Sequence, residues 1–163
     1  MIDWNAKIKE ALDRTEFMAI STIGEDGSWT CPVQFGYSGT LDLYFKSMPH
    51  SKHVQNLLKD ERISVAIYKT DRFPGSERDV LGLQLAGTVR LLTQRADVEE
   101  AARCYYGRDP RKLDYKTKID EHVGGNAEWN FFKITPTELW CFDSRIFGEE
   151  REKVDLENLY IQT

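Results

Sequence analysis

Residues 17–37 read FMAISTIGEDGSWTCPVQFGY, and this stretch decides the fold because it contains two strand-like runs joined by a tight turn. Both runs are rich in β-branched, aromatic and apolar side chains, and the Asp26-Gly27 pair lies between them. An Asp-Gly pair in this setting is a strong signal for a β-hairpin. Pro32 lacks a backbone N–H, so we expect the second strand to lie at a sheet edge or to carry a bulge there.

The rest of the chain continues with short strands and a few helices. Gly82 and Gly87 lie inside an apolar run and indicate a bulge, a barrel corner or close approach by another group. Hairpin-linked strands, with a helix between the third and the fourth, predict a mainly β (α+β) domain over residues 1–163, a small antiparallel barrel with flanking helices. The expected strands are residues 17–23, 29–37, 41–46, 62–68, 81–92, 131–134 and 138–142, with a turn at Thr135-Pro136 between the last two. The expected helices begin near Trp4, Ser51 and Ala96, and the third ends on a C-cap at Gly107.

The composition disfavours several classes of protein. The 163 residues include 27 Asp and Glu against 22 Lys and Arg, a formal net charge of -5, whereas binding to a nucleic acid backbone needs an extended basic face. No apolar run approaches the roughly 20 residues that span a bilayer, and the charged N-terminal stretch is unlike a signal peptide. Cys31, Cys104 and Cys141 form no CxxC pair, so we expect neither a disulfide framework nor a structural zinc site, and we expect a cytoplasmic location.

A basic cluster interrupts this acidic background at residues 44–57, YFKSMPHSKHVQNL. The cluster falls where an expected strand gives way to an expected helix. A helix N-terminus has free N–H groups and a partial positive charge, so polar side chains at this junction predict a phosphate site. The residues expected to converge there are Lys46, Ser47, Ser51, Lys52 and His53.

Two alternatives stay open for this cluster. The first is an ordinary solvated helix start, in which Ser51 only caps the helix and the lysines face water. The second, which we favour least, is a metal site at His50-x-x-His53. The remaining histidine, His122, is remote in the sequence and no carboxylate is spaced to join the pair, so we expect no metal.

The order of these features resembles the FMN-binding split barrels related to pyridoxamine 5'-phosphate oxidase. The resemblance runs from the hairpin, with its Pro-Val step, through a strand ending in Tyr44-Phe45 and the Ser51-Lys52 helix start to LQLAGTVRLL, and less tightly into FFKITPTELWCFDSR. It covers roughly two-thirds of the chain, and the ordered set of motifs is more specific than any one of them. It implies a split β-barrel that binds FMN at the interface of a two-fold homodimer.

Carried over by position, the resemblance implies a cofactor site built from three segments. The strand around Pro32 follows the edge of the isoalloxazine ring, where a missing ladder donor leaves backbone groups free for a ligand. The segment around Lys52 faces the phosphate and ribityl chain, and Gln84 approaches from the long strand. The implied cofactor-binding residues are Thr30, Cys31, Pro32, Val33, Lys46, Ser47, Ser51, Lys52, His53 and Gln84. Trp140 is a further candidate because an aromatic ring can stack on the flavin, although ordinary core packing is favoured for such residues.

The resemblance implies a flavoprotein oxidoreductase with a small-molecule electron donor and acceptor, but not a particular substrate. True pyridoxamine phosphate oxidases carry a C-terminal Arg-x-His motif that this chain lacks. No side chain stands out as a catalytic acid or base. The alternative is a non-catalytic flavin or haem binding or sensor module on the same fold.

Residues 71–79 and 108–128 exceed what a small barrel needs and are expected to form a partial lid. Arg108 and Arg111 are candidates to bind an anionic substrate, although ordinary solvated charges are favoured.

Overall fold

The computed structural model describes residues 2–69, 80–109 and 118–163. Within these residues the chain forms seven strands and five helices. The strands are β1 (Phe17–Gly24), β2 (Gly27–Tyr37), β3 (Leu43–Ser47), β4 (Arg62–Tyr68), β5 (Leu81–Leu91), β6 (Asn130–Asp143) and β7 (Glu152–Lys153). The helices are α1 (Trp4–Asp13), α2 (Lys52–Leu57), α3 (Arg95–Gly107), α4 (Ile119–His122) and α5 (Ser144–Phe147). None of the described helices has the length and apolar character needed to cross a membrane.

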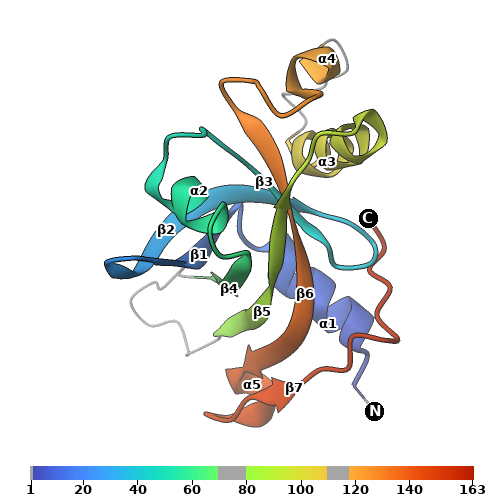
Figure 1. The fold of residues 1–163 in the computed structure, drawn as a ribbon. Helices are drawn as coiled ribbons and strands as arrows, with labels where there is room; N and C mark the ends of the chain where they lie inside the picture. The colour runs from blue at the N-terminus through green and yellow to red at the C-terminus, as the bar shows by residue number, and fades with distance from the viewer. Residues whose placement is uncertain (1, 70–79, 110–117) are drawn as a thin grey trace.

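The strands form an antiparallel barrel, as the sequence predicts. They follow the order β3-β2-β1-β4-β5-β6-β7, and an additional pairing of β3 with β6 closes the first six into a ring (Figure 1). The hairpin prediction is also confirmed, since β1 and β2 pair from Phe17–Gln34 to Gly24–Gly27. Gly27 has a φ of 108°, a conformation that glycine adopts without steric cost.

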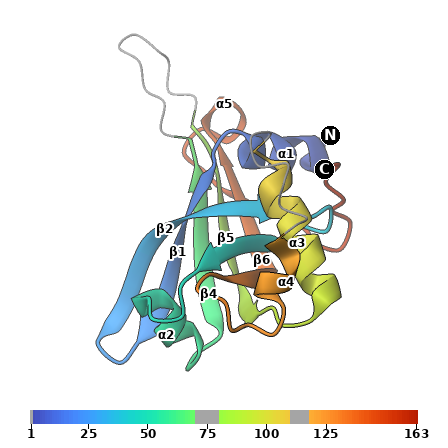
Figure 2. The same ribbon diagram turned by 90° about the horizontal axis from the view of Figure 1, so that it is seen from above.

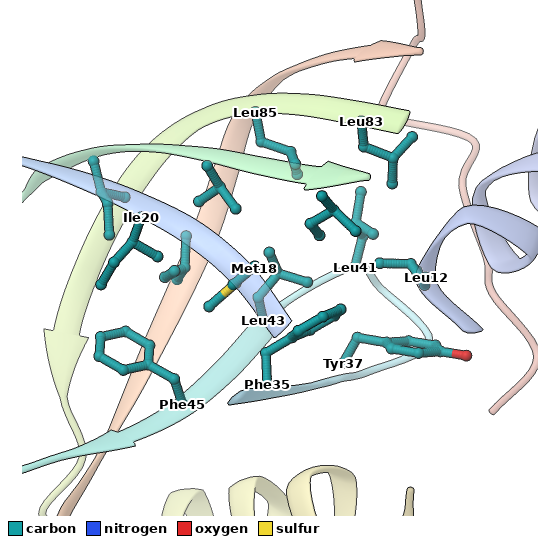
Figure 3. Packing of buried hydrophobic residues seen from close by; sticks show 14 of the residues in the cluster. Leu12, Met18, Ile20, Phe35, Tyr37, Leu41, Leu43, Phe45, Leu83 and Leu85 are labelled. Atoms are coloured by element: carbon teal, nitrogen blue, oxygen red, sulfur yellow. The ribbon is translucent and has the colours of Figure 1, made fainter. Parts of the chain in front are cut away.

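Inward-facing side chains of the barrel strands make the main core. Met18, Ile20, Phe35, Phe45 and their neighbours project between the strands and fill the interior (Figure 3). Because successive side chains of a strand point to opposite faces, the residues between them face outward. Helix α1 adds Ile8, Ala11 and Leu12 to the same core.

A second, smaller core joins α3 to the outer side of the barrel. Tyr44 of β3 and Phe131 of β6 pack there against Val98, Ala101 and Cys104 of the helix. The helix backbone comes so close to β2 that a Cβ placed on Gly36 would lie 2.4 Å from the Cys104 carbonyl oxygen. This contact fixes α3 beside β2 and β3.

Two local expectations are wrong. Residues 131–134 and 138–142 belong to the single strand β6, with no turn at Thr135-Pro136. Its pairing with β5 shifts register between Ala86 and Gly87 instead, where Gly87 permits close approach of the Thr135 carbonyl oxygen. At the end of α3, Gly107 is the last helical residue, and the C-cap is Arg108 in the right-handed conformation.

Candidate functional site

The barrel is split between β2 and β3. The two strands pair only from Phe35–Phe45 to Tyr37–Leu43, so residues 27–34 of β2 bond to β1 on one side and leave their other edge free. Figure 2 shows β2 curving away from β3, with α2 beyond the end of β3. We call the region bordered by this free edge, the end of β3 and α2 the split.

Backbone groups of alternate β2 residues face the split. In a hairpin with a two-residue turn, the hydrogen-bonded pairs recur at every second residue from the turn, so Cys31 and Val33 bond to β1. The 3.2 Å bond from Phe35 N to Glu16 O fits the same alternation. Thr30, Pro32 and Gln34 therefore direct their backbone groups to the free edge. Pro32 lies at an edge as expected, and its missing N–H costs the ladder with β1 nothing.

The side chains of this strand divide between the two faces. Cys31 and Val33 point into the barrel core, and burial raises the pKa of the Cys31 thiol, as expected for an inert cysteine. Thr30 and Pro32 are exposed on the outer face, where the Thr30 hydroxyl lies 2.7 Å from that of Ser21. Thr30 and Pro32 thus direct their backbone groups to the split and their side chains to the outer face. Cys31 and Val33 direct their backbone groups to β1 and their side chains to the core.

Three of the predicted phosphate ligands form a compact cluster at the end of β3. The buried Ser47 hydroxyl lies 2.6 Å from His53 Nε2 and 3.1 Å from the Ser51 hydroxyl. Ser51 donates to the Met48 carbonyl at 2.8 Å and makes no side-chain cap to α2. Burial lowers the pKa of His53, which favours the neutral imidazole at pH 7.

Lys46 does not join this cluster. Its ammonium donates to Tyr106 Oη at 2.8 Å, on the side of β3 that faces α3. The expected convergence of lysines from both segments is therefore not seen, because neighbouring residues of a strand point to opposite faces. Helix α2 has only six residues, so the positive charge at this junction comes from side chains more than from a helix dipole.

Lys52 lies across the mouth of the split. Its Nζ is 4.7 Å from the centroid of the Trp29 ring, which joins α2 to the β1–β2 hairpin. Neither Lys52 nor Lys46 pairs with a carboxylate in the described part of the chain. Five other lysines each lie within 3.3 Å of a carboxylate oxygen, namely Lys7, Lys9, Lys59, Lys133 and Lys153. The two lysines beside the split therefore have charge available for a ligand.

Gln84 and Trp140 lie on another part of the outer face. They are direct partners across β5 and β6, and Gln84 is also opposite Ala66, which is opposite Ala19, the partner of Pro32. Gln84 is thus three strands from Pro32, or about 14 Å at about 4.8 Å per strand. Gln84 accepts from Arg151 Nε at 3.1 Å, and Trp140 donates to Glu138 at 2.8 Å.

A pocket of about 500 Å³ lies beside the far end of the free edge. Gln34, Tyr37, Tyr105 and Arg108 are among the residues that line it. The Arg108 guanidinium donates to the carbonyls of Leu12, Thr15 and Phe35, so it braces the pocket wall, in contrast to the solvated charge expected for it. Burial lowers its pKa.

Further residues named in the sequence analysis have the following positions. Arg111 and the loop from Asp71 to Asp79 lie outside the described residues, and so do residues 110–117 of the second expected lid segment. His50 is exposed, and the described residues contain no group of three His, Cys, Asp or Glu that could hold a metal ion. The sequence alone does not predict the parts played by Tyr106 and Trp29, the aromatic partners of Lys46 and Lys52. Strand alternation would have separated Lys46 from Ser47, but no local signal points to Tyr106.

The geometry defines a six-stranded split barrel with an open edge beside two lysines that have no carboxylate partner among residues 2–69, 80–109 and 118–163. Residues 5–140 match the family model of pyridoxamine 5'-phosphate oxidase, and the chain belongs to this family. None of the curated proteins matches the chain.

Solved structures share the fold at low sequence identity. A heme binding protein from Mycobacterium smegmatis has a TM-score of 0.72 and 15% identity, over 96% of this chain and 60% of that one, so this chain spans less than two thirds of that protein. A protein from Clostridium acetobutylicum related to general stress protein 26 has a TM-score of 0.66 and 17% identity, over 98% and 100%. General Stress Protein 26 from Bacillus anthracis has a TM-score of 0.61 and 12% identity, over 94% and 100%.

Proposed function

We propose that this protein is a homodimeric FMN-dependent oxidoreductase. The observation that supports it best is the pair of lysines, Lys46 and Lys52, that border the free edge of β2 without a carboxylate partner among the described residues. A half-buried or ring-stacked cation that is not neutralised by the protein favours an anionic ligand. FMN carries a phosphate at one end, which suits the cation at Lys52. Its other end has a polar pyrimidine edge, which suits the free backbone groups of β2.

The residues fit the cofactor in distinct roles. The free backbone groups of Thr30, Pro32 and Gln34 would hold the polar edge of the ring, because a strand edge presents donors and acceptors in the plane of the sheet. Lys52 would leave the Trp29 ring and bind the phosphate, with Ser51 beside it; charge-assisted hydrogen bonds of this kind contribute about 1.5 to 3 kcal/mol each. Ser47 and His53 would position Ser51 from the inner side.

The reaction chemistry would be that of the flavin, which transfers a hydride between a small-molecule donor and acceptor. The chain's own part is to bind, orient and shield. The pocket beside Gln34 and Tyr105 adjoins the free edge and is the place we propose for the donor or acceptor. Three unpaired cysteines suit a reducing compartment, and we propose that the protein acts in the cytoplasm.

A second copy would complete the site. The outer face of β1, β2, β4 and β5 leaves Phe17 and Tyr68 more than half exposed, with the small side chains of Ala19 and Ala66 in the row beside them. An exposed face of this kind favours association. Gln84 is about 14 Å from Pro32 in its own subunit, three strand spacings, so one ring held at Pro32 would meet a Gln84 only from the partner.

The test is the identity of the bound ligand. FMN should bind the purified protein more tightly than riboflavin in a fluorescence titration, because the phosphate meets Lys52. Equal affinities would contradict the phosphate site. Reduction of bound FMN by NAD(P)H, with turnover on an acceptor, supports an enzyme; bound flavin without turnover, or a haem absorption spectrum in its place, supports the binding or sensor module.

A further inference from the structure

Lys46 is a half-buried cation with unusual surroundings. Its Nζ lies 2.8 Å from Tyr106 Oη and 5.4 Å from the centroids of the Tyr106 and Phe131 rings. No carboxylate pairs with it in the described part of the chain. On the same side of the sheet, Lys133 is neutralised by Asp42 at 2.6 Å. Among the described residues, therefore, one of these two lysines is neutralised and the other has no anionic partner.

His122, a titratable neighbour of this arrangement, does not supply a counter-charge. His122 packs edge-on against Phe131, with ring centroids 5.0 Å apart. Its Nδ1 lies 2.8 Å from the Trp129 carbonyl, an acceptor only, so Nδ1 carries the proton. Burial and the charge of Lys46 lower the pKa of His122, which keeps the imidazole neutral at pH 7.

A continuous set of contacts connects Lys46 to the free edge of β2. The Tyr106 ring meets the Tyr105 ring edge-on at 5.1 Å, and Tyr105 donates to Gln34 Oε1 at 3.0 Å. Gln34 is one of the residues whose backbone faces the split. Lys46 and the free edge therefore lie on the same outer side of the barrel, and a ligand held by the edge comes within reach of this charge.

We propose that Lys46 neutralises the negative charge that a flavin ring gains on reduction and so sets the reduction potential of the cofactor; this rests on the proposed function. A hydride from the donor adds two electrons and one proton to the ring, which leaves its pyrimidine end more negative than before. Lys46 pairs with that charge in the reduced state alone, and so binds the reduced cofactor more tightly than the oxidised one. Lys52, in contrast, meets the phosphate in both states.

The test compares three variants by the midpoint potential of bound FMN, measured by equilibration with a reference dye. Lys46→Met removes the charge at similar length, Lys46→Arg keeps it, and Lys59→Met is a control at an exposed lysine that pairs with Glu25. In Lys46→Met, the affinity for reduced relative to oxidised FMN should fall about tenfold, which lowers the potential by about 30 mV for a two-electron couple. The other two variants should stay within a few millivolts of the wild-type value.

Each outcome supports or overturns the proposed role of Lys46. An unchanged potential in Lys46→Met, with FMN bound, overturns this inference and leaves the proposed function standing. If Lys46→Met weakens the binding of oxidised FMN but not of riboflavin, Lys46 contacts the phosphate, and this result also overturns the inference. A wild-type protein that binds no flavin overturns both proposals. Thermal unfolding checks each variant, and Lys46→Gln serves in the same measurement if Lys46→Met does not fold.

Discussion

Lys46 and Ser47 are consecutive in the chain, yet their side chains serve opposite sides of β3. The Lys46 ammonium donates to Tyr106 Oη at 2.8 Å, whereas the Ser47 hydroxyl lies 2.6 Å from His53 Nε2. A single phosphate cannot be held by both, because strand alternation separates them. Lys46 and Lys52 are therefore two cationic positions with different contacts, and we propose separate tasks for them.

Lys52→Ala should weaken FMN binding by about 1.5 to 3 kcal/mol, or roughly ten- to a hundredfold, because it deletes one charge-assisted contact. The side chain is exposed on the first turn of α2, so the free energy of unfolding should change by less than about 0.5 kcal/mol. A fluorescence titration with FMN measures the first quantity and urea unfolding the second.

Lys59→Ala is the matched control for this experiment. Lys59 follows the same helix, is exposed, and pairs with Glu25 at 2.6 Å, away from the cluster of Ser47 and His53. The control should bind FMN as the wild type does. Equal losses in the two variants would show that overall charge, and not a contact of Lys52, governs the affinity.

The sequence predicts much of this fold because its signals are local. The hairpin signalled by Asp26-Gly27 is confirmed, with Glu25 and Asp26 as its turn residues, and so are the alternating strands. Gly87, expected to mark a bulge, a barrel corner or a close approach, lies at the register shift between β5 and β6. The continuous strand β6 is missed because a Thr-Pro step resembles a turn when its partner strand is unknown. The contact of Lys46 with Tyr106 is missed because 60 residues separate the two in the chain. Such pairings depend on how α3 packs, which no local pattern reports.

Gly36→Ala should test that packing. A Cβ at this position would lie 2.4 Å from the Cys104 carbonyl oxygen, so α3 must move away from β2. Overpacking of this kind costs about 1 to 3 kcal/mol of unfolding free energy, measurable by urea unfolding. Gly107→Ala is the control, since nothing lies within 4 Å of a Cβ built there. A stability loss in the control but not in Gly36→Ala would contradict the placement of α3.

The proposed dimer makes a separate prediction. Ala66→Glu puts a charge in the middle of the outer face, between Ala19 and Gln84 in the same row. The variant should be monomeric by light scattering at micromolar concentration, because an unpaired charge buried at an interface is costly. FMN affinity should fall with it if the partner covers the ring.

Gln162→Glu adds the same charge near the C-terminus, where the side chain is exposed, and should remain dimeric. A wild-type protein that is monomeric under these conditions and still binds FMN tightly would remove the need for a partner at the site.

Asp143 is a charged residue buried away from the split. Its side chain is fully buried and accepts from Lys7 Nζ at 2.7 Å and from Arg145 Nη2 at 2.7 Å. Arg145, and to a smaller extent Lys7, hold the pKa of this carboxyl well below its usual range against the effect of burial. The ion pairs connect α1 to the end of β6, and we expect them to govern stability in acid.

Asp143→Asn should lower the free energy of unfolding by about 3 kcal/mol at pH 7, because two cations lose a buried partner. A carboxyl whose folded pKa lies below its unfolded value of about 3.9 contributes stability that is complete above that value and is lost as the pH falls through it towards the folded pKa. The difference in stability between wild type and variant should therefore be constant from pH 7 to about pH 5 and shrink from there to pH 2. Urea unfolding across this range measures it, with Glu152→Gln, an exposed acid on β7, as a control expected to change little at any pH. A difference that grows as the pH falls would show that Asp143 is protonated more easily in the folded protein than in the unfolded chain, which its contacts with Lys7 and Arg145 do not allow.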